Sequence, residues 1–237
     1  MKKLLLFSLV TLVFVPKTFA QNDGLVAAAA GLAAVGAAIV SVDNMKEQAE
    51  LTATEWLMNN RPDITSFSLK TLDFDGKKAK DMSAVSLITY KIQEFQLAEK
   101  PKLDGKKYVL FGFTSHGWIN EYGANFSKVR WYLIDSHEWM NMMTAYVKTA
   151  SSERDDTSIK ETLRSGKIVN RGVNSRTNES ISFYKLDGDM YTVRDYNESM
   201  KLVYNERSLG IYLKQTSDLV QIGRNDIIKI HDFFYSE

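Results

Sequence analysis

The stretch with the most potential for chemistry is "GFTSHGWINEYGANF", residues 112–126. It contains three glycines, and His116, Trp118, Glu121 and Tyr122 lie within seven residues of one another. Aromatic rings can stack on a ligand, while imidazole and carboxylate groups can orient it. The sequence therefore indicates a weak candidate ligand-binding site in the 115–125 loop. The favoured alternative is a long hairpin loop that packs its own aromatic rings.

Catalytic and metal-binding motifs are missing from the sequence. Ser115 stands three residues after Gly112, which does not fit the G-x-S-x-G pattern of a serine nucleophile. The chain has no cysteine, so thiolate ligands and disulfides are excluded. The three histidines, His116, His137 and His231, are far apart and form no metal-binding motif. The sequence thus predicts no catalytic residue, no metal site and no cofactor, and it favours a non-enzymatic role.

Residues 1–20 are typical of a secretory signal peptide. Lys2 and Lys3 precede a twelve-residue apolar run, and Ala20 precedes the expected cleavage site. Removal of this segment leaves 27 basic and 29 acidic residues, a formal charge of −2. That balance gives no electrostatic basis for binding nucleic acid. We therefore expect an exported protein of the periplasm, the outer envelope or the extracellular space.

Residues 24–42, "GLVAAAAGLAAVGAAIVSV", carry no charge and include eight alanines and three glycines. Three interpretations fit this segment: a membrane span, a helix buried in its own domain, and a helix that docks onto another envelope protein or a second copy. The length suits a span, but alanine contributes little to insertion, so membrane contact is the least favoured. On a helix the large residues form one stripe that could bind a partner: Leu25, Leu32, Val35 and Ile39.

The next segment, 43–60, has the pattern of an amphipathic helix. Met45, Ala49, Ala53 and Trp56 are spaced by four, four and three residues. Pro62 disfavours helical geometry at the residue before it, so we expect the helix to end at Asn60. Trp56 is the expected extension of the partner-binding stripe.

Residues 61–150 predict an antiparallel sheet covered by one helix. The alternation of apolar residues changes phase between Leu69 and Leu72, which indicates a β-bulge in the first strand. Asp135 and Glu138 have the spacing of a helix cap and its partner, and an apolar stripe follows over 136–150. The remaining expected strands are 84–95, 108–114 and 126–134.

The last third of the chain predicts a β-meander. The polar stretch 151–158 is the expected linker, and a short helix should run from Ser158 to Gly166. Short apolar runs separated by turn residues then predict strands only. These expected strands are 167–169, 181–186, 190–196, 200–204, 209–213, 219–222 and 227–234.

These patterns together predict an α+β fold with apolar and amphipathic N-terminal helices, a helix-covered antiparallel sheet and an antiparallel meander. The expected divisions are a signal peptide (1–20), a helical segment (21–60), an α+β subdomain (61–150) and a β-rich subdomain (158–237). We expect a non-enzymatic component of an envelope complex that binds another protein, or itself, through helix 24–42. The alternative is a secreted ligand-binding or hydrolytic domain with its site in the 115–125 loop.

Overall fold

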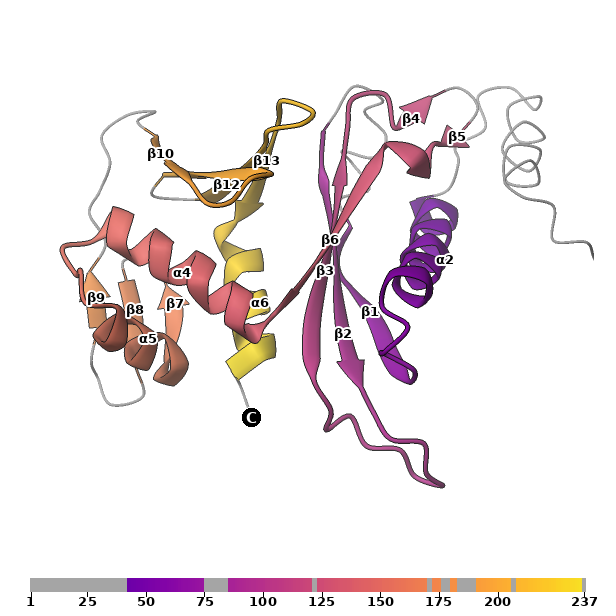
Figure 1. Cartoon of the computed structure of the whole chain (residues 1–237), viewed down its shortest axis with the longest axis horizontal. Helices are drawn as coiled ribbons and strands as arrows, with labels where there is room; N and C mark the ends of the chain where they lie inside the picture. Colours follow the sequence, from indigo (N-terminus) through magenta and orange to yellow (C-terminus); the bar gives the residue numbers. More distant parts are fainter. Residues whose placement is uncertain are drawn as a thin grey trace, which may run out of the picture.

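A computed structural model describes residues 42–74, 85–120, 123–169, 172–175, 180–182, 191–205 and 208–235. Its helices and strands build an α+β fold with two four-stranded antiparallel sheets, as the sequence predicts (Figure 1). The predicted signal peptide and most of the apolar segment 24–42 lie outside the described residues.

The first sheet has the strand order β1-β2-β3-β6, and every neighbouring pair is antiparallel. Its strands are β1 (Phe67–Phe74), β2 (Leu87–Glu94), β3 (Lys107–Thr114) and β6 (Val129–Asp135). The register of β1 on β2 shifts between Thr71 and Asp73. This shift confirms the predicted bulge, and it turns Leu72 and Phe74 to opposite faces of the sheet.

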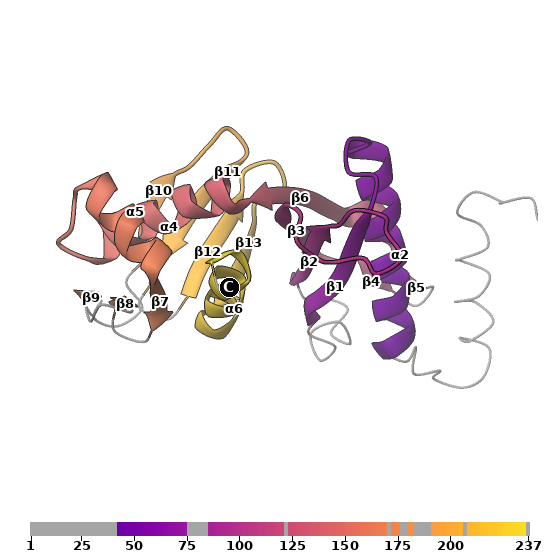
Figure 2. The same cartoon turned by 90° about the horizontal axis from the view of Figure 1, so that it is seen from below.

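The first sheet separates two apolar clusters, and Figure 2 shows helices against both of its faces. Helix α2 (Val42–Asn60) covers one face and buries Met45, Ala49 and Ala53 of the predicted stripe. The fourth buried position is Leu57 rather than Trp56, which is only partly buried. The helix ends at Asn60 as expected. On the opposite face Val109, Phe111 and Phe113 of β3 join a larger cluster that also contains side chains of the second sheet.

The second sheet has the order β10-β11-β12-β13 and is a simple meander. Its strands are β10 (Thr192–Asp195), β11 (Met200–Tyr204), β12 (Ser208–Leu213) and β13 (Asp218–Gly223). A three-stranded sheet contains β7 (Gly166–Val169), β8 (Gly172–Ser175) and β9 (Ser180–Ser182). A two-stranded hairpin, β4 (Ile119–Asn120) and β5 (Gly123–Ala124), precedes the 3-10 helix η1 (Phe126–Lys128).

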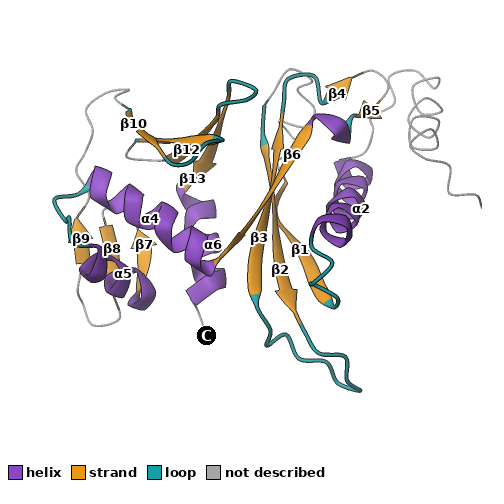
Figure 3. Cartoon of the chain, viewed as in Figure 1, coloured by secondary structure: helices purple, strands orange, loops and turns teal. Residues whose placement is uncertain are grey.

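The prediction of a strand at 227–234 is wrong, because this segment lies in the helix α6 (Arg224–Tyr235; Figure 3). Its buried side chains Ile227, Ile230, His231 and Phe234 follow the spacing i, i+3, i+4, i+7 of a helical stripe. The β-branched isoleucines favour a strand locally, but tertiary packing decides the outcome. Helix α6 contacts β1 and β3 of the first sheet, β12 and β13 of the second sheet, and β7.

Helix α4 (Ser136–Ala150) follows β6 directly, as predicted. Asp135 is its N-cap and accepts a hydrogen bond from the Glu138 N–H at 2.8 Å. Trp139, Met142, Met143 and Tyr146 are buried, which confirms the predicted stripe. These side chains belong to the cluster shared with both four-stranded sheets, so α4 packs between elements of the two predicted subdomains.

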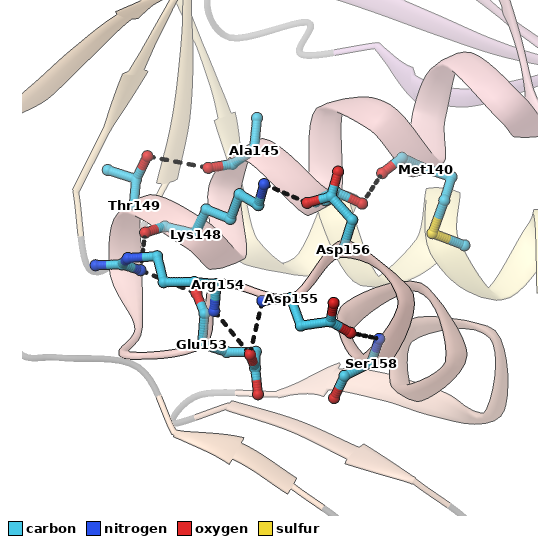
Figure 4. Close-up of polar contacts among 10 residues, drawn as sticks. Met140, Ala145, Lys148, Thr149, Glu153, Arg154, Asp155, Asp156 and Ser158 are labelled. Atoms are coloured by element: carbon cyan, nitrogen blue, oxygen red, sulfur yellow. Dashed lines mark hydrogen bonds and ion pairs between the residues drawn. The ribbon is translucent and has the colours of Figure 1, made fainter.

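The predicted linker 151–158 is instead a compact connection between α4 and α5 (Asp156–Ser165), shown in Figure 4. Lys148 forms an ion pair with Asp156, and the Arg154 guanidinium donates to the Lys148 carbonyl. Asp155 accepts the Ser158 N–H at 2.7 Å, so α5 starts two residues earlier than predicted. Polar composition here reflects helix capping rather than a flexible spacer.

Candidate functional site

An open cleft of about 1300 Å³ lies where β6 passes into α4. One wall is the turn between β2 and β3 (103–106), and a second wall is the first turn of α4 (135–138). The C-terminal end of α6 (232–234) also lines the cleft, and Lys91, Gln93 and Lys107 contribute from the first sheet. Segments that are far apart in the sequence therefore meet at this cleft.

The β2–β3 turn is fixed by backbone bonds around Glu94. The Glu94 N–H donates to the Lys106 carbonyl at 2.9 Å, and the Gly105 N–H donates to the Glu94 carbonyl at 3.1 Å. A Cβ atom on Gly105 would stand 2.6 Å from that carbonyl oxygen, so the close approach requires glycine. The Gln93 side-chain amide donates to the Leu103 carbonyl at 2.7 Å. This wall is therefore held in place.

The wall made by α4 is held by a carboxylate that accepts hydrogen bonds from two tyrosine hydroxyls. Glu138 Oε1 accepts the Tyr132 hydroxyl at 3.1 Å and the Tyr196 hydroxyl at 2.7 Å. Burial, followed by the nearby Glu138 charge, raises the pKa of Tyr132 to about 12. Burial, followed by the hydrogen bond with Glu138, raises the pKa of Tyr196. These bonds tie α4 to β6 and to the turn before β11.

Lys91 and Lys107 share one aromatic ring. Their Nζ atoms lie 5.2 Å and 5.5 Å from the centre of the Phe233 ring, within cation–π range. Burial lowers the pKa of Lys91, and the positive charges of neighbouring lysines, Lys107 among them, lower it further. Asp232 acts in the opposite direction and favours the charged ammonium. The fold therefore places the Lys91 ammonium group where burial and neighbouring lysines disfavour its charge.

Beyond Tyr108 the cleft is bordered by groups that bind one another. The Arg61 guanidinium lies 5.2 Å from the centre of the Tyr108 ring and donates two hydrogen bonds to Asp63, at 2.8 Å and 2.7 Å. The Tyr108 hydroxyl donates to Glu94 Oε1 at 2.8 Å. The Arg61 guanidinium is thus bound to the Asp63 carboxylate. The hydrogen bond from Arg61 holds the pKa of Asp63 below its usual value.

The structure separates the residues of the expected loop site. The His116 side chain is exposed, and its backbone carbonyl accepts Lys128 Nζ at 3.3 Å. Trp118 is 1% exposed and packs edge-to-face on Phe126, with 6.3 Å between ring centres. Trp118 also belongs to the apolar cluster under α2. Glu121 and Tyr122 lie outside the described residues.

The expected partner-binding residues are described only in part. Leu25, Leu32, Val35 and Ile39 lie outside the described residues. Trp56 is partly buried and packs against the cluster between α2 and the first sheet. Part of the Trp56 side chain therefore stabilises the fold, and the remainder faces solvent.

No described group of residues has the geometry of a metal site: none of the described His, Asp and Glu side chains form a cluster of three or more that could hold an ion. His231 is 1% exposed and bonds inside the core, through Nδ1 to the Trp139 indole N–H at 3.3 Å and through Nε2 to the Leu163 carbonyl at 2.7 Å. Both ring nitrogens are therefore in structural bonds.

Comparison with family models, curated proteins and solved structures gives no match for this chain. Within the part of the chain that the structure describes, no helix is both long enough and apolar enough to span a bilayer. The cleft is a feature that the sequence patterns did not indicate. Lys91, Lys107 and Phe233 come from three different elements, and no local spacing brings them together.

Proposed function

We propose that this chain is an exported cell-envelope protein that acts by binding another protein, with residues 24–42 as the docking element. The observation that carries the proposal is the way in which α2, the helix directly after this segment, is attached. One stripe of α2 packs on the first sheet, and two of the stripe's four residues, Ala49 and Ala53, are small. Helix α2 therefore holds Val42, the C-terminal end of the docking segment, close to the folded body.

The outer side of α2 also carries apolar side chains. Leu51 is 67% exposed and Met58 is 63% exposed. At 100° per residue, both point away from the stripe of Met45, Ala49, Ala53 and Leu57. We propose that the partner bound by residues 24–42 also covers these two side chains, which α2 leaves exposed on its outer side.

A hydrolytic or ligand-binding site in the 115–125 loop has less support. Trp118, the residue best suited to stack on a ligand, is inside the core. A ligand could reach it only if the hairpin of β4 and β5 opened. His116 remains exposed, but it has no second described candidate beside it from the predicted set.

The docking proposal is tested by placing charge in the expected stripe. The double variant Val35→Asp/Ile39→Asp and the parent chain would each be cross-linked in native envelopes, purified and identified by mass spectrometry. We expect the variant to lose the cross-linked partner and to keep the melting temperature of the parent. Leu97→Asp is the matched control, because Leu97 is 82% exposed on the β2–β3 turn, an apolar position outside the proposed surface.

Two results would contradict the proposal. If the double variant fails to fold in isolation, residues 24–42 belong to the core of the domain. If both variants retain the same cross-linked partner equally well, the segment does not dock. The mass spectra also report whether Gln21 is the mature N-terminus.

A further inference from the structure

The outermost strand of the second sheet, β10, has one unpaired edge in the part of the chain that the structure describes (Figure 1). Its other edge pairs with β11. All four residues of β10 are exposed, and the exposed fraction of Val193 is 58%. Tyr191, just before the strand, is 47% exposed. An open strand edge with exposed apolar side chains is a template on which another strand can pair.

The hydrogen bonds between β10 and β11 show which backbone groups face the open edge. The Tyr196 N–H donates to the carbonyl of Met200, the residue opposite it when the register of the two strands is continued, at 3.2 Å. Hydrogen-bonded and non-hydrogen-bonded pairs alternate along an antiparallel ladder. Val193 and Val203 therefore form a non-hydrogen-bonded pair. The N–H and carbonyl of Val193 point away from β11, as do those of the residues two positions before and after it.

We propose that β10 pairs with β10 of a second copy of this chain, antiparallel and centred on Val193, so that the two second sheets form one continuous sheet. In this register Val193 lies opposite Val193 of the second copy, and Tyr191 lies opposite Asp195. All three residues whose backbone groups face the open edge then exchange hydrogen bonds with the second copy. A register centred on Arg194 would instead place two guanidinium groups opposite each other, which is destabilising.

The side chains along this edge complement one another in the proposed register. On the face of the sheet away from the core, the two Val193 side chains meet, and each Tyr191 ring lies diagonal to Val193 of the second copy, within reach of an aromatic side chain. The Tyr191 hydroxyl can donate to the Asp195 carboxylate of the second copy. On the other face Thr192 lies opposite Arg194. The exposed apolar side chains at this edge are thus covered by their own counterparts.

The acidic group at this edge is already neutralised within its own chain. Asp195 forms ion pairs with Lys214 at 2.9 Å and with Lys201 at 4.0 Å. Its charge therefore does not repel a second copy. The contact lies on the second sheet, whereas the docking segment continues from α2 on the first sheet, so the two proposals are independent. A contact made by one short strand is smaller than a stable interface, and we expect a Kd on the order of 100 µM.

The first test uses cysteine at the centre of the proposed pair. The chain has no cysteine, so Val193→Cys in the mature full-length protein introduces a single thiol. Opposite residues of a hydrogen-bonded pair have Cα atoms about 5.5 Å apart, a distance that a disulfide spans. Oxidised glutathione should therefore link two copies at least tenfold faster than in the control Leu219→Cys. Leu219 is 43% exposed on β13, the opposite edge strand of the same sheet.

The second test removes one backbone donor at the open edge. Val193→Pro deletes an N–H that has no partner on β11, and proline is tolerated where the N–H of an edge strand faces solvent. We expect its melting temperature to stay within about 2 °C of the parent value. Sedimentation equilibrium should show dimers for the parent and monomers for this variant. Val193→Thr is the control, because it keeps the N–H and the branched side chain, and it should dimerise like the parent.

Four results would overturn the proposal. The parent could remain monomeric up to about 1 mM, or Leu219→Cys could cross-link as fast as Val193→Cys. Val193→Pro could dimerise like the parent, or it could fail to fold, which would show that its N–H is needed within the chain. Val35→Asp/Ile39→Asp should leave the dimer unchanged. A dimer lost in that variant and kept in Val193→Pro would assign self-association to residues 24–42 instead of β10.

Discussion

Replacement of His231 by phenylalanine tests whether the imidazole joins three helices. His231 on α6 accepts the Trp139 indole N–H of α4 and bonds the Leu163 carbonyl of α5, at 3.3 Å and 2.7 Å. These two bonds require the neutral ring with its proton on Nε2. A phenylalanine ring of similar shape fills the space without replacing either bond.

The expected loss of stability comes from the two polar groups that His231 now binds. The Trp139 N–H and the Leu163 carbonyl would be left without this partner in a region where Trp139 and Leu163 are both 0% exposed. Each buried polar group left without a partner costs about 1–3 kcal/mol. We therefore expect His231→Phe to lower the free energy of unfolding by about 3 kcal/mol, a large part of the ~5–15 kcal/mol typical of a domain.

Urea denaturation followed by tryptophan fluorescence measures this change. If the free energy of unfolding falls by about 2–3 kcal/mol per M of urea, the urea concentration at the midpoint of unfolding should fall by roughly 1–1.5 M. The control is His137→Phe, because His137 is exposed on the same helix as Trp139 and should change stability by less than about 0.5 kcal/mol. An unfolding midpoint for His231→Phe equal to that of the control would refute the reasoning.

Two further predictions concern the first sheet and the ionisable phenols. Gly112→Ala should lower the free energy of unfolding by about 1–3 kcal/mol in urea denaturation, because its Cβ would stand 2.6 Å from the Trp131 ring. The free energy of unfolding should fall as pH rises from about 10 to about 12. The pKa values of Tyr132 and Tyr235 are raised to about 12 in the fold. The contribution of these two phenols to stability is therefore complete below about pH 10, and it is lost as pH rises toward about 12. Tyr132→Phe/Tyr235→Phe should weaken this pH dependence in alkaline denaturation curves, and an unchanged dependence would contradict the assignment.

Local patterns in the sequence were sufficient for the elements whose signals are local. The cap at Asp135, the stripe of α4 and the bulge near Leu72 depend on spacings of a few residues, and the structure confirms each of them. Residues 227–234 were predicted as a strand from their short apolar run, although the spacing of Ile227, Ile230, His231 and Phe234 also fits a helical stripe. The structure buries that stripe where α6 packs against three sheets.

The cleft could not be predicted from local patterns, because its residues come from distant parts of the chain. Lys91, Lys107 and Phe233 each fit an ordinary amphipathic pattern, and only the packing of α6 on the first sheet brings the ring beneath both lysines. Trp118 shows the opposite case. Its position in a glycine-rich loop suggested a ligand site, but the β4–β5 hairpin folds the indole into the core. Composition indicates which side chains could bind, and burial decides which of them are accessible.

We propose that residues 42–235 fold without the apolar segment 24–41, and that this segment binds a partner. The free energy of unfolding in urea tests this when it is measured for the chain that begins at Gln21 and for a chain that begins at Val42. We expect the two values to agree within about 1 kcal/mol, since the buried stripe of α2 packs with side chains of the first sheet. A loss of more than about 4 kcal/mol, or a truncated chain that does not fold, would contradict it and place residues 24–42 in the core.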